Sequence, residues 1–337
     1  MSYSIAPYDG KSLTDFSTMS PWPSLAEKAF CLKYGVRKEE TLFYYDASPS
    51  NDGLLGTMLS DAPIVMLIHG LGDEADSWRH IIPLLNSRGY RVLAVDLPGF
   101  GRSISLGKIN LENHAAAVLK LLEAVLQSSG QNDKGVFLAG NSMGALVAEV
   151  VALENPEISR GLILIAGSIP GGPSNPGPFV LAKLLFSRKW YRAYQGNPIK
   201  AWESLRPYYA DLDSLAQEDK DFLQKRVMER VESRTQERAF FETQSSLIKA
   251  YLTASSRFAR LIQAYKGKIF LLWGDKDRVM PLSSAERFKA LRSDIKLELV
   301  SGAGHLPQQE KPNETAWLMA DFMERALDPQ PAQAGIR

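Results

Sequence analysis

Short apolar runs rich in Val, Ile and Leu alternate with longer amphipathic runs from residue 63 onward. Such continuous apolar runs are typical of strands in a parallel sheet, because helices cover both faces of that sheet. The runs that predict strands are PIVMLIHG from 63, YRVLAVD from 90, KGVFLAG from 134, RGLILIAG from 160, GKIFLLWG from 267 and IKLELVSG from 295. We therefore expect an α/β fold with a mostly parallel sheet flanked by helices.

The runs between these strands carry apolar residues at helical spacing. Gly89 and Gly130 suit the left-handed position that ends a helix, and Asn313 suits an N-cap. The helices are predicted in SWRHIIPLLNSRG from 77, ENHAAAVLKLLEAVLQSSG from 112, SMGALVAEVVALEN from 142, SSAERFKALRS from 283 and NETAWLMADFMERAL from 313. This alternation assigns residues 61–168 and 266–328 to one α/β core.

The stretch between Gly167 and Gly267 is far longer than the usual connection of a few residues. It opens with a Gly/Pro-rich link, which we expect to act as a hinge near 170–178, and then becomes helical. In DKDFLQKRVMERVESR from 219 the apolar residues fall on one stripe, as in a helix that buries one face. We expect a helical cap over residues 169–265.

Residues 1–60 are expected to form an N-terminal extension with a helix and an edge strand. PSLAEKAFCLKYG carries a capping box, Ser24 with Glu27, and a stop at Gly35, which together predict the helix. ETLFYYD from 40 predicts the strand. Residues 329–337 are assigned to a C-terminal tail.

Charge and composition narrow the kind of partner. The 39 Lys and Arg nearly balance the 38 Asp and Glu, so no strong field favours nucleic acid or an anionic membrane. No uninterrupted apolar run is long enough for stable membrane insertion. The single cysteine, Cys31, cannot form an intrachain disulfide, and the first residues lack a secretory signal pattern, so we expect a cytoplasmic protein with a small-molecule substrate.

The segment VFLAGNSMGALVAEVVAL from 136 raises a chemical question, because Ser142 stands where a strand is expected to meet a helix. A nucleophile on such a tight turn needs small residues two positions before and after it, and Gly140 and Gly144 meet that need. The turn would expose the Ser142 hydroxyl at the carboxyl edge of the sheet. It would also leave the N–H of Met143, at the positive end of the next helix, free to bind an oxyanion.

This arrangement resembles the α/β-hydrolase family over residues from about 60 to 325. The resemblance implies a catalytic serine, acid and histidine in that order along the chain, with Ser142 as the nucleophile. LLWGDKDRVMP from 271 and LVSGAGHLPQQEKP from 299 are similar to the segments that carry the acid and the histidine. The family pattern W-G-x-x-D-x-x-x-P matches Asp277 and leaves Asp275 as an additional carboxylate.

The chain has four histidines, and His305 is expected to be the base because it lies in the loop of the last of these segments. His80 and His114 fall in helical runs and are expected to be packing or surface residues. By resemblance, His69 and Gly70 in HGLG shape the oxyanion loop, and the N–H of Leu71 is the second oxyanion donor beside Met143. This plan requires no metal, and the PGFGRS segment lacks the third glycine of a dinucleotide site, so no cofactor is expected.

The cap carries many large apolar residues, which predict a pocket for a hydrophobic substrate. We expect a carboxylesterase acting on a small to medium hydrophobic ester. The GNSMG spelling also resembles carbon–carbon bond hydrolases that act on ring-cleaved dienones, although those usually have an aromatic residue where Leu306 stands. Such an enzyme would need cap cations for a carboxylate, and the available ones are Arg188, Arg192 and Arg206. A non-catalytic ligand-binding member is a third, weaker interpretation.

Overall fold

The computed structural model describes residues 3–9, 19–34, 40–49, 61–105, 107–131, 135–170 and 188–328. These residues form a nine-stranded sheet in the order β1-β2-β3-β5-β4-β6-β7-β8-β9. The strands are β1 (Tyr3–Pro7), β2 (Ala29–Tyr34), β3 (Glu40–Ala47), β4 (Ile64–Ile68), β5 (Arg91–Val95), β6 (Val136–Asn141), β7 (Ser159–Ile165), β8 (Lys268–Gly274) and β9 (Lys296–Val300).

Strands β4 to β9 are the six that the apolar runs predict, and each pairs with its neighbours among them in parallel. Every residue of β4 and β6 is buried, because helices cover both faces of the sheet. The predicted α/β fold with a mostly parallel sheet is therefore confirmed.

The N-terminal region differs from its prediction. The expected helix from Ser24 to Gly35 is only a short 3-10 helix, η1 (Pro23–Lys28), whose N-terminus has no side-chain cap. The chain then enters β2, which pairs antiparallel with β1 and with β3. Pairing on both sides outweighs the local capping pattern, because strand formation depends mainly on tertiary neighbours. The strand expected from residue 40 is β3.

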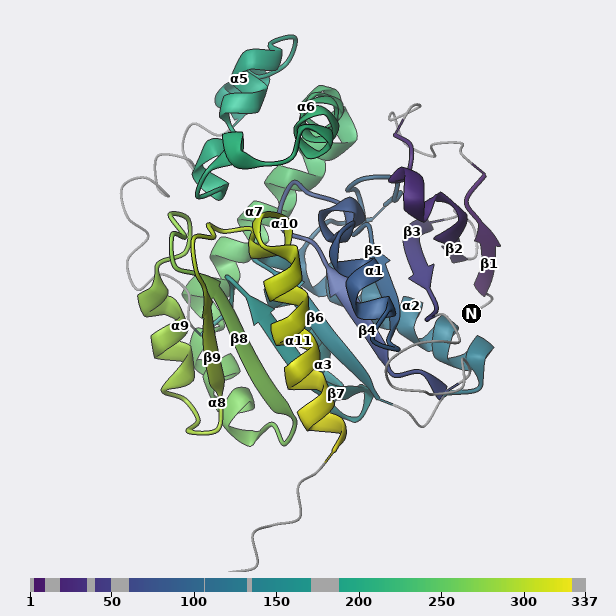
Figure 1. The fold of residues 1–337 in the computed structure, drawn as a ribbon, viewed down its shortest axis with the longest axis vertical. Helices are drawn as coiled ribbons and strands as arrows, with labels where there is room; N and C mark the ends of the chain where they lie inside the picture. Colours follow the sequence, from purple (N-terminus) through teal and green to yellow (C-terminus); the bar gives the residue numbers. More distant parts are fainter. Residues whose placement is uncertain are drawn as a thin grey trace, which may run out of the picture.

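Helices pack on both sides of the sheet. α1 (Ile81–Asn86) and α11 (Pro312–Leu327) contact each other on the face turned to the viewer in Figure 1, and α2 (Leu111–Ser129) contacts α3 (Met143–Glu154). The remaining core helices are η3 (Ala75–Trp78), η4 (Pro156–Ile158), α9 (Leu282–Lys289) and α10 (Pro307–Glu310). No helix in the described part of the chain is long and apolar enough to cross a membrane.

The predicted helix ends are partly correct. Gly130 follows α2 in the left-handed conformation with φ 67°, and Gly89 has φ 91°. Asn313, however, does not cap α11, because the helix already begins at Pro312 and Lys311 holds the N-cap position. A proline at the first helical position needs no N–H partner, which explains the earlier start.

A helical cap follows β7, as expected. It contains α5 (Pro198–Glu203), η5 (Arg206–Tyr208), η6 (Leu212–Ser214), α6 (Gln217–Glu232), α7 (Arg234–Thr253) and α8 (Ser255–Ala264). Figure 1 shows α5 and α6 at the top, beyond the sheet. Two apolar clusters hold α6 to the rest of the cap, one through Val227 and Val231 and one through Leu223. The proposed hinge near 170–178 lies largely outside the described residues, and 169–265 remain the proposed bounds of the cap.

Candidate active site

Ser142 lies in a strained turn between β6 and α3. Its φ of 54° and ψ of −118° are unusual for a residue with a side chain, and such backbone costs about 1–3 kcal/mol. The turn is packed tightly, since a Cβ added to Gly140 would lie 2.1 Å from the carbonyl oxygen of Gly144. A Cβ on Gly144 would lie 2.1 Å from the carbonyl oxygen of Ile68. Only glycine fits at both positions, as the sequence pattern predicts.

His305 and Asp277 form a buried pair on the loops that follow β9 and β8. His305 Nδ1 lies 2.9 Å from Asp277 Oδ2, and both side chains are almost fully buried. The other oxygen, Oδ1, accepts hydrogen bonds from the N–H groups of Val279 and Met280 at 2.8 and 2.9 Å. The carboxylate is thus held in one orientation toward the imidazole.

Asp275, the other carboxylate in this loop, is directed elsewhere. Its Oδ1 accepts a hydrogen bond from the N–H of Gly302 at 2.8 Å, and nearly a third of its side chain is exposed. Of the two aspartates, Asp277 is the one that contacts His305.

The backbone of His305 is fixed from two directions. Its N–H donates to the carbonyl oxygen of Tyr208 in the cap at 2.8 Å, and its own carbonyl accepts from Asn141 Nδ2 at 3.0 Å. Asn141 directly precedes Ser142 in the chain. The structure therefore brings the loop of His305 to the turn of Ser142. The ring of Tyr208 lies beside the imidazole of His305, with the two ring centroids 6.0 Å apart.

The HGLG loop passes beside the same turn. A Cβ added to Gly70 would lie 3.5 Å from the Cβ of Ser142. His69 is fully buried, donates from Nδ1 to the carbonyl of Gly70 at 2.7 Å, and accepts at Nε2 from the N–H of Leu97 at 2.9 Å. Burial lowers the pKa of His69 and keeps it neutral, which suits a residue that shapes the loop. Leu71 follows in this loop, and Met143 begins α3, where its N–H has no intrahelical acceptor.

The two remaining histidines bond to residues of the cap. His80 Nε2 lies 2.8 Å from Asp219, and His114 Nε2 lies 2.9 Å from the hydroxyl of Thr243. Complete burial lowers the pKa of His114 to about 3. Both residues help to join the cap to the core.

Sequence reasoning missed a group of buried charges near the HGLG loop. Arg226 and Arg230 of α6 pair with three acids that follow this loop, Asp73, Glu74 and Asp76. Burial raises the pKa of Glu74 to about 7, while Arg230 acts in the opposite direction. Three acids within four positions, shortly after the apolar run that begins at Pro63, were a signal in the sequence for buried cations nearby.

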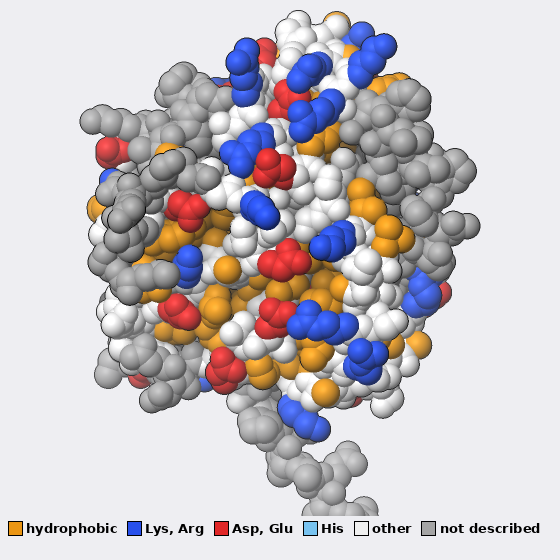
Figure 2. All heavy atoms as spheres, turned by 180° about the vertical axis from the view of Figure 1, so that it is seen from behind, with side chains coloured by type: hydrophobic (Ala, Val, Ile, Leu, Met, Phe, Trp, Pro, Cys, Tyr) orange, Lys and Arg blue, Asp and Glu red, His pale blue; other side chains and the backbone are white. Residues whose placement is uncertain are grey.

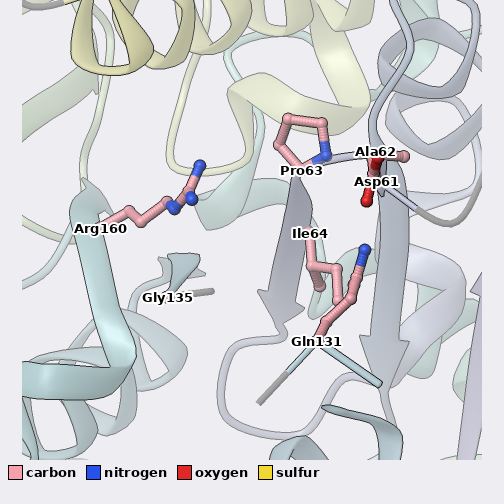
Figure 3. A pocket seen from close by; sticks show the side chains of 7 residues that line it. All are labelled: Asp61, Ala62, Pro63, Ile64, Gln131, Gly135 and Arg160. Carbon is pink, nitrogen blue, oxygen red and sulfur yellow. The ribbon is translucent and has the colours of Figure 1, made fainter. Parts of the chain in front are cut away.

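Two further features bear on ligands. A cavity of about 240 Å³ lies at the amino ends of β4, β6 and β7, where Arg160 and Gln131 line it (Figure 3), so it is at the opposite edge from Ser142. Among the described residues, no cluster of three or more His, Cys, Asp or Glu side chains could hold a metal ion.

Comparison with known proteins places the chain among hydrolases. The profile of the alpha/beta hydrolase family matches residues 65–316. A 2-hydroxy-6-oxononadienedioate/2-hydroxy-6-oxononatrienedioate hydrolase from Cupriavidus pinatubonensis is 27% identical over 266 residues, covering 78% of this chain and 87% of the relative.

Solved structures show the same fold. The 2-hydroxy-6-oxo-6-phenylhexa-2,4-dienoate hydrolase from Rhodococcus has a TM-score of 0.66 at 20% identity, covering 85% of this chain and 95% of that one. A thermophilic esterase from Thermogutta terrifontis also has a TM-score of 0.66, at 19% identity, covering 88% and 98%. With the family profile spanning most of the sheet and the cap, this chain belongs to the alpha/beta hydrolase family.

Proposed function

We propose that this hydrolase cleaves a carboxylic ester of a small to medium hydrophobic substrate. Ser142 is the nucleophile, His305 is the base, and Asp277 is the acidic triad member, whose carboxylate orients His305. The observation that carries the proposal is the buried contact of 2.9 Å between His305 Nδ1 and Asp277 Oδ2. A carboxylate at Nδ1 keeps the proton there, so Nε2 is left as the atom that can accept the serine proton.

The reaction would proceed through an acyl-enzyme. His305 Nε2 takes the proton of Ser142 Oγ as this oxygen attacks the ester carbonyl, and Asp277 stabilises the imidazolium that forms. The N–H groups of Leu71 and Met143 would bind the developing oxyanion, and loss of one such donor costs about 3 kcal/mol in the barrier. His305 then protonates the leaving alcohol, and water attacks the acyl-enzyme in the reverse sequence.

Cap charges favour an ester over a dienone that carries carboxylates. Arg192 pairs with Glu237, and Arg206 pairs with Glu203 and Asp213. The guanidinium carbon of Arg188 lies 5.1 Å from the centroid of the Phe241 ring. Seen from behind, Lys and Arg gather on the outer surface at the top of the molecule (Figure 2). The three arginines expected to bind a substrate carboxylate therefore contact other groups of the cap, and the side chains of Arg192 and Arg206 are exposed, which supports a neutral substrate.

The alternative is cleavage of a carbon–carbon bond in a ring-cleaved dienone. It is favoured by the names of several curated relatives, among them the Cupriavidus protein, which are hydrolases of a dienedioate. Leu306 after His305 and the engaged arginines count against it. The two functions share the serine, so substrate assays must separate them.

The test is turnover of p-nitrophenyl esters graded from acetyl to long acyl, and of 2-hydroxy-6-oxononadienedioate, by the wild-type protein and by Ser142→Ala. We expect ester turnover that peaks at one chain length and disappears in Ser142→Ala. Turnover of the dienedioate alone, with Ser142 still labelled by a fluorophosphonate, would reverse the order of the two functions. Full ester activity in Ser142→Ala would overturn the assignment of Ser142 as the nucleophile.

A matched pair of variants tests the acid. Asp277→Asn keeps the size of the side chain but disrupts its pairing with His305, so kcat should fall by about 10³–10⁴-fold. Asp275→Asn changes a neighbouring carboxylate that contacts Gly302 instead, so kcat should stay within about threefold of the wild type. Reversed severities would contradict the assignment of Asp277.

A further inference from the structure

A buried ion-pair cluster joins the cap to the segment just after Leu71. Arg230 of α6 contacts Asp73 Oδ1 with Nη2 at 2.5 Å and both oxygens of Glu74 with Nε and Nη2 at 2.6 Å. Each of these three side chains is at least nine-tenths buried. One guanidinium therefore holds two neighbouring carboxylates in a fixed geometry, which a point charge could not reproduce.

Asp73 is also part of the turn that the HGLG loop makes. The N–H of Asp73 donates to the carbonyl oxygen of Gly70 at 3.2 Å and closes a turn around Leu71 and Gly72. Asp73 Oδ1 also accepts the N–H of Glu74 at 3.0 Å, and its Oδ2 lies 3.4 Å from Gln309 Nε2. Displacing Asp73 would thus rotate the peptide that carries the N–H of Leu71.

A second contact joins the cap to this loop. A Cβ added to Gly72, whose φ is 76°, would lie 3.2 Å from the ring of Phe240 in α7. Phe240 packs in turn on Tyr191, whose hydroxyl donates to the carbonyl oxygen of Arg230 at 2.9 Å. Arg230 and Phe240 thus belong to one packed unit of the cap. Both contact the turn between Gly70 and Asp73, Arg230 at Asp73 and Phe240 beside Gly72.

We propose that Arg230 is a positioning residue for the oxyanion site: by holding Asp73 and Glu74 it directs the N–H of Leu71 toward the oxygen that becomes negative. This rests on the proposed function, in which Leu71 is an oxyanion donor. Through Arg230, the cap then contributes to catalysis although Arg230 itself does not contact the substrate. The contact of α6 with the core is then what completes the oxyanion site.

The experiment compares Arg230→Lys with a control at the same interface. Lysine keeps the charge but cannot hold both carboxylates at once. The control is Asp219→Asn, which weakens another buried contact of α6, the 2.6 Å pair with Arg79, several residues farther along the core segment. For each variant we would measure kcat and KM for the best ester, the affinity of a matching trifluoromethyl ketone, and the melting temperature.

The ketone is the informative probe, because its adduct with the serine carries the negative oxygen. In Arg230→Lys we expect kcat to fall by about tenfold or more, ketone affinity to fall by the same factor, and KM to change less than about threefold. Asp219→Asn should lower the melting temperature and leave kcat and ketone affinity near those of the wild type.

Equal effects of Arg230→Lys and Asp219→Asn on kcat and ketone affinity would overturn the inference and leave Arg230 as a structural contact. If Arg230→Lys does not fold, the same measurements on the double variant with Arg230→Met and Glu74→Gln test the inference. This double variant removes one buried cation and one buried anion together. Failure of the proposed function is distinguishable, because it would appear as unchanged turnover in Ser142→Ala.

Discussion

Glu149 is a carboxyl group buried inside α3, seven residues after Ser142. Its Oε2 accepts a hydrogen bond from the N–H of Ile169 at 2.8 Å, while Oε1 has no hydrogen-bond partner in the part of the chain that the structure describes. Burial raises the pKa of Glu149 to about 8, so the folded protein holds this side chain protonated at neutral pH.

The raised pKa predicts how stability depends on pH. Between the ordinary value of 4.5 and about 8 the folded protein keeps a proton that the unfolded chain releases. The contribution of this group is therefore fully present below pH 4.5 and is lost as the pH rises through 8. Glu149→Gln mimics the protonated form and should not lose this stability. The difference in unfolding free energy between Glu149→Gln and the wild type should therefore grow by about 2 kcal/mol, in favour of the variant, as the pH rises from 6 to 8.5.

Urea denaturation at the two pH values measures this difference. Glu154→Gln is the matched control, because Glu154 lies on the same helix but is partly exposed and paired with Arg257. Its profile should run parallel to that of the wild type. A parallel profile in Glu149→Gln as well would show that Glu149 is ionised in the folded protein.

The turn between β6 and α3 is the element that the sequence predicts best. Its determinants are local, since the small residues on either side of Ser142 lie two positions away. The strands β4 to β9 are also predictable, because strands buried on both faces are continuous apolar runs. β2 is not, because Ala29–Tyr34 becomes a strand only through pairing with β1 and β3, which lie outside its own sequence.

The close packing of this turn predicts the effect of one methyl group. Gly144→Ala would place a Cβ 2.1 Å from the carbonyl oxygen of Ile68, a backbone atom that cannot move without shifting β4. We expect the unfolding free energy to fall by about 3 kcal/mol or more and ester turnover to be lost. Gly107→Ala is the control, because its Cβ would meet only the Glu40 carboxylate, at 3.6 Å. Near-normal stability in Gly144→Ala would contradict the described contact of α3 with β4.

At the scale of the whole molecule, the contacts between cap and core could not be predicted. Arg226 lies 150 positions after Asp76 and Arg230 lies 156 positions after Glu74, and helical spacing alone marks both arginines as ordinary polar residues of α6. The contact between His305 and Asp277 was predictable for the opposite reason, since each residue lies in a short segment with its own pattern. The assignment of Ser142, Asp277 and His305 as a triad rests on the order of such segments along the chain and stays a prediction.

The segment 19–22 connects the sheet with the cap. The N–H of Trp22 donates to the hydroxyl of Tyr45 in β3 at 2.9 Å, and its ring packs on Phe222 of α6 with centroids 4.9 Å apart. Arg226 donates from Nη2 to the carbonyl oxygen of Ser20 at 2.6 Å. The N-terminal extension therefore contacts both layers that must separate if the cap opens.

Trp22→Ala should destabilise the protein and loosen the cap selectively. Removing a large ring that is 7% exposed costs about 3 kcal/mol or more, and part of that loss falls on the contact with α6. Amide exchange measured by mass spectrometry should then accelerate in α6 more than in β8, where no such contact is lost. Trp190→Ala serves as the control, because this cap residue is 63% exposed and its removal should change stability by less than about 0.5 kcal/mol. Equal acceleration in α6 and β8 would mean that Trp22 stabilises the fold as a whole and does not hold the cap.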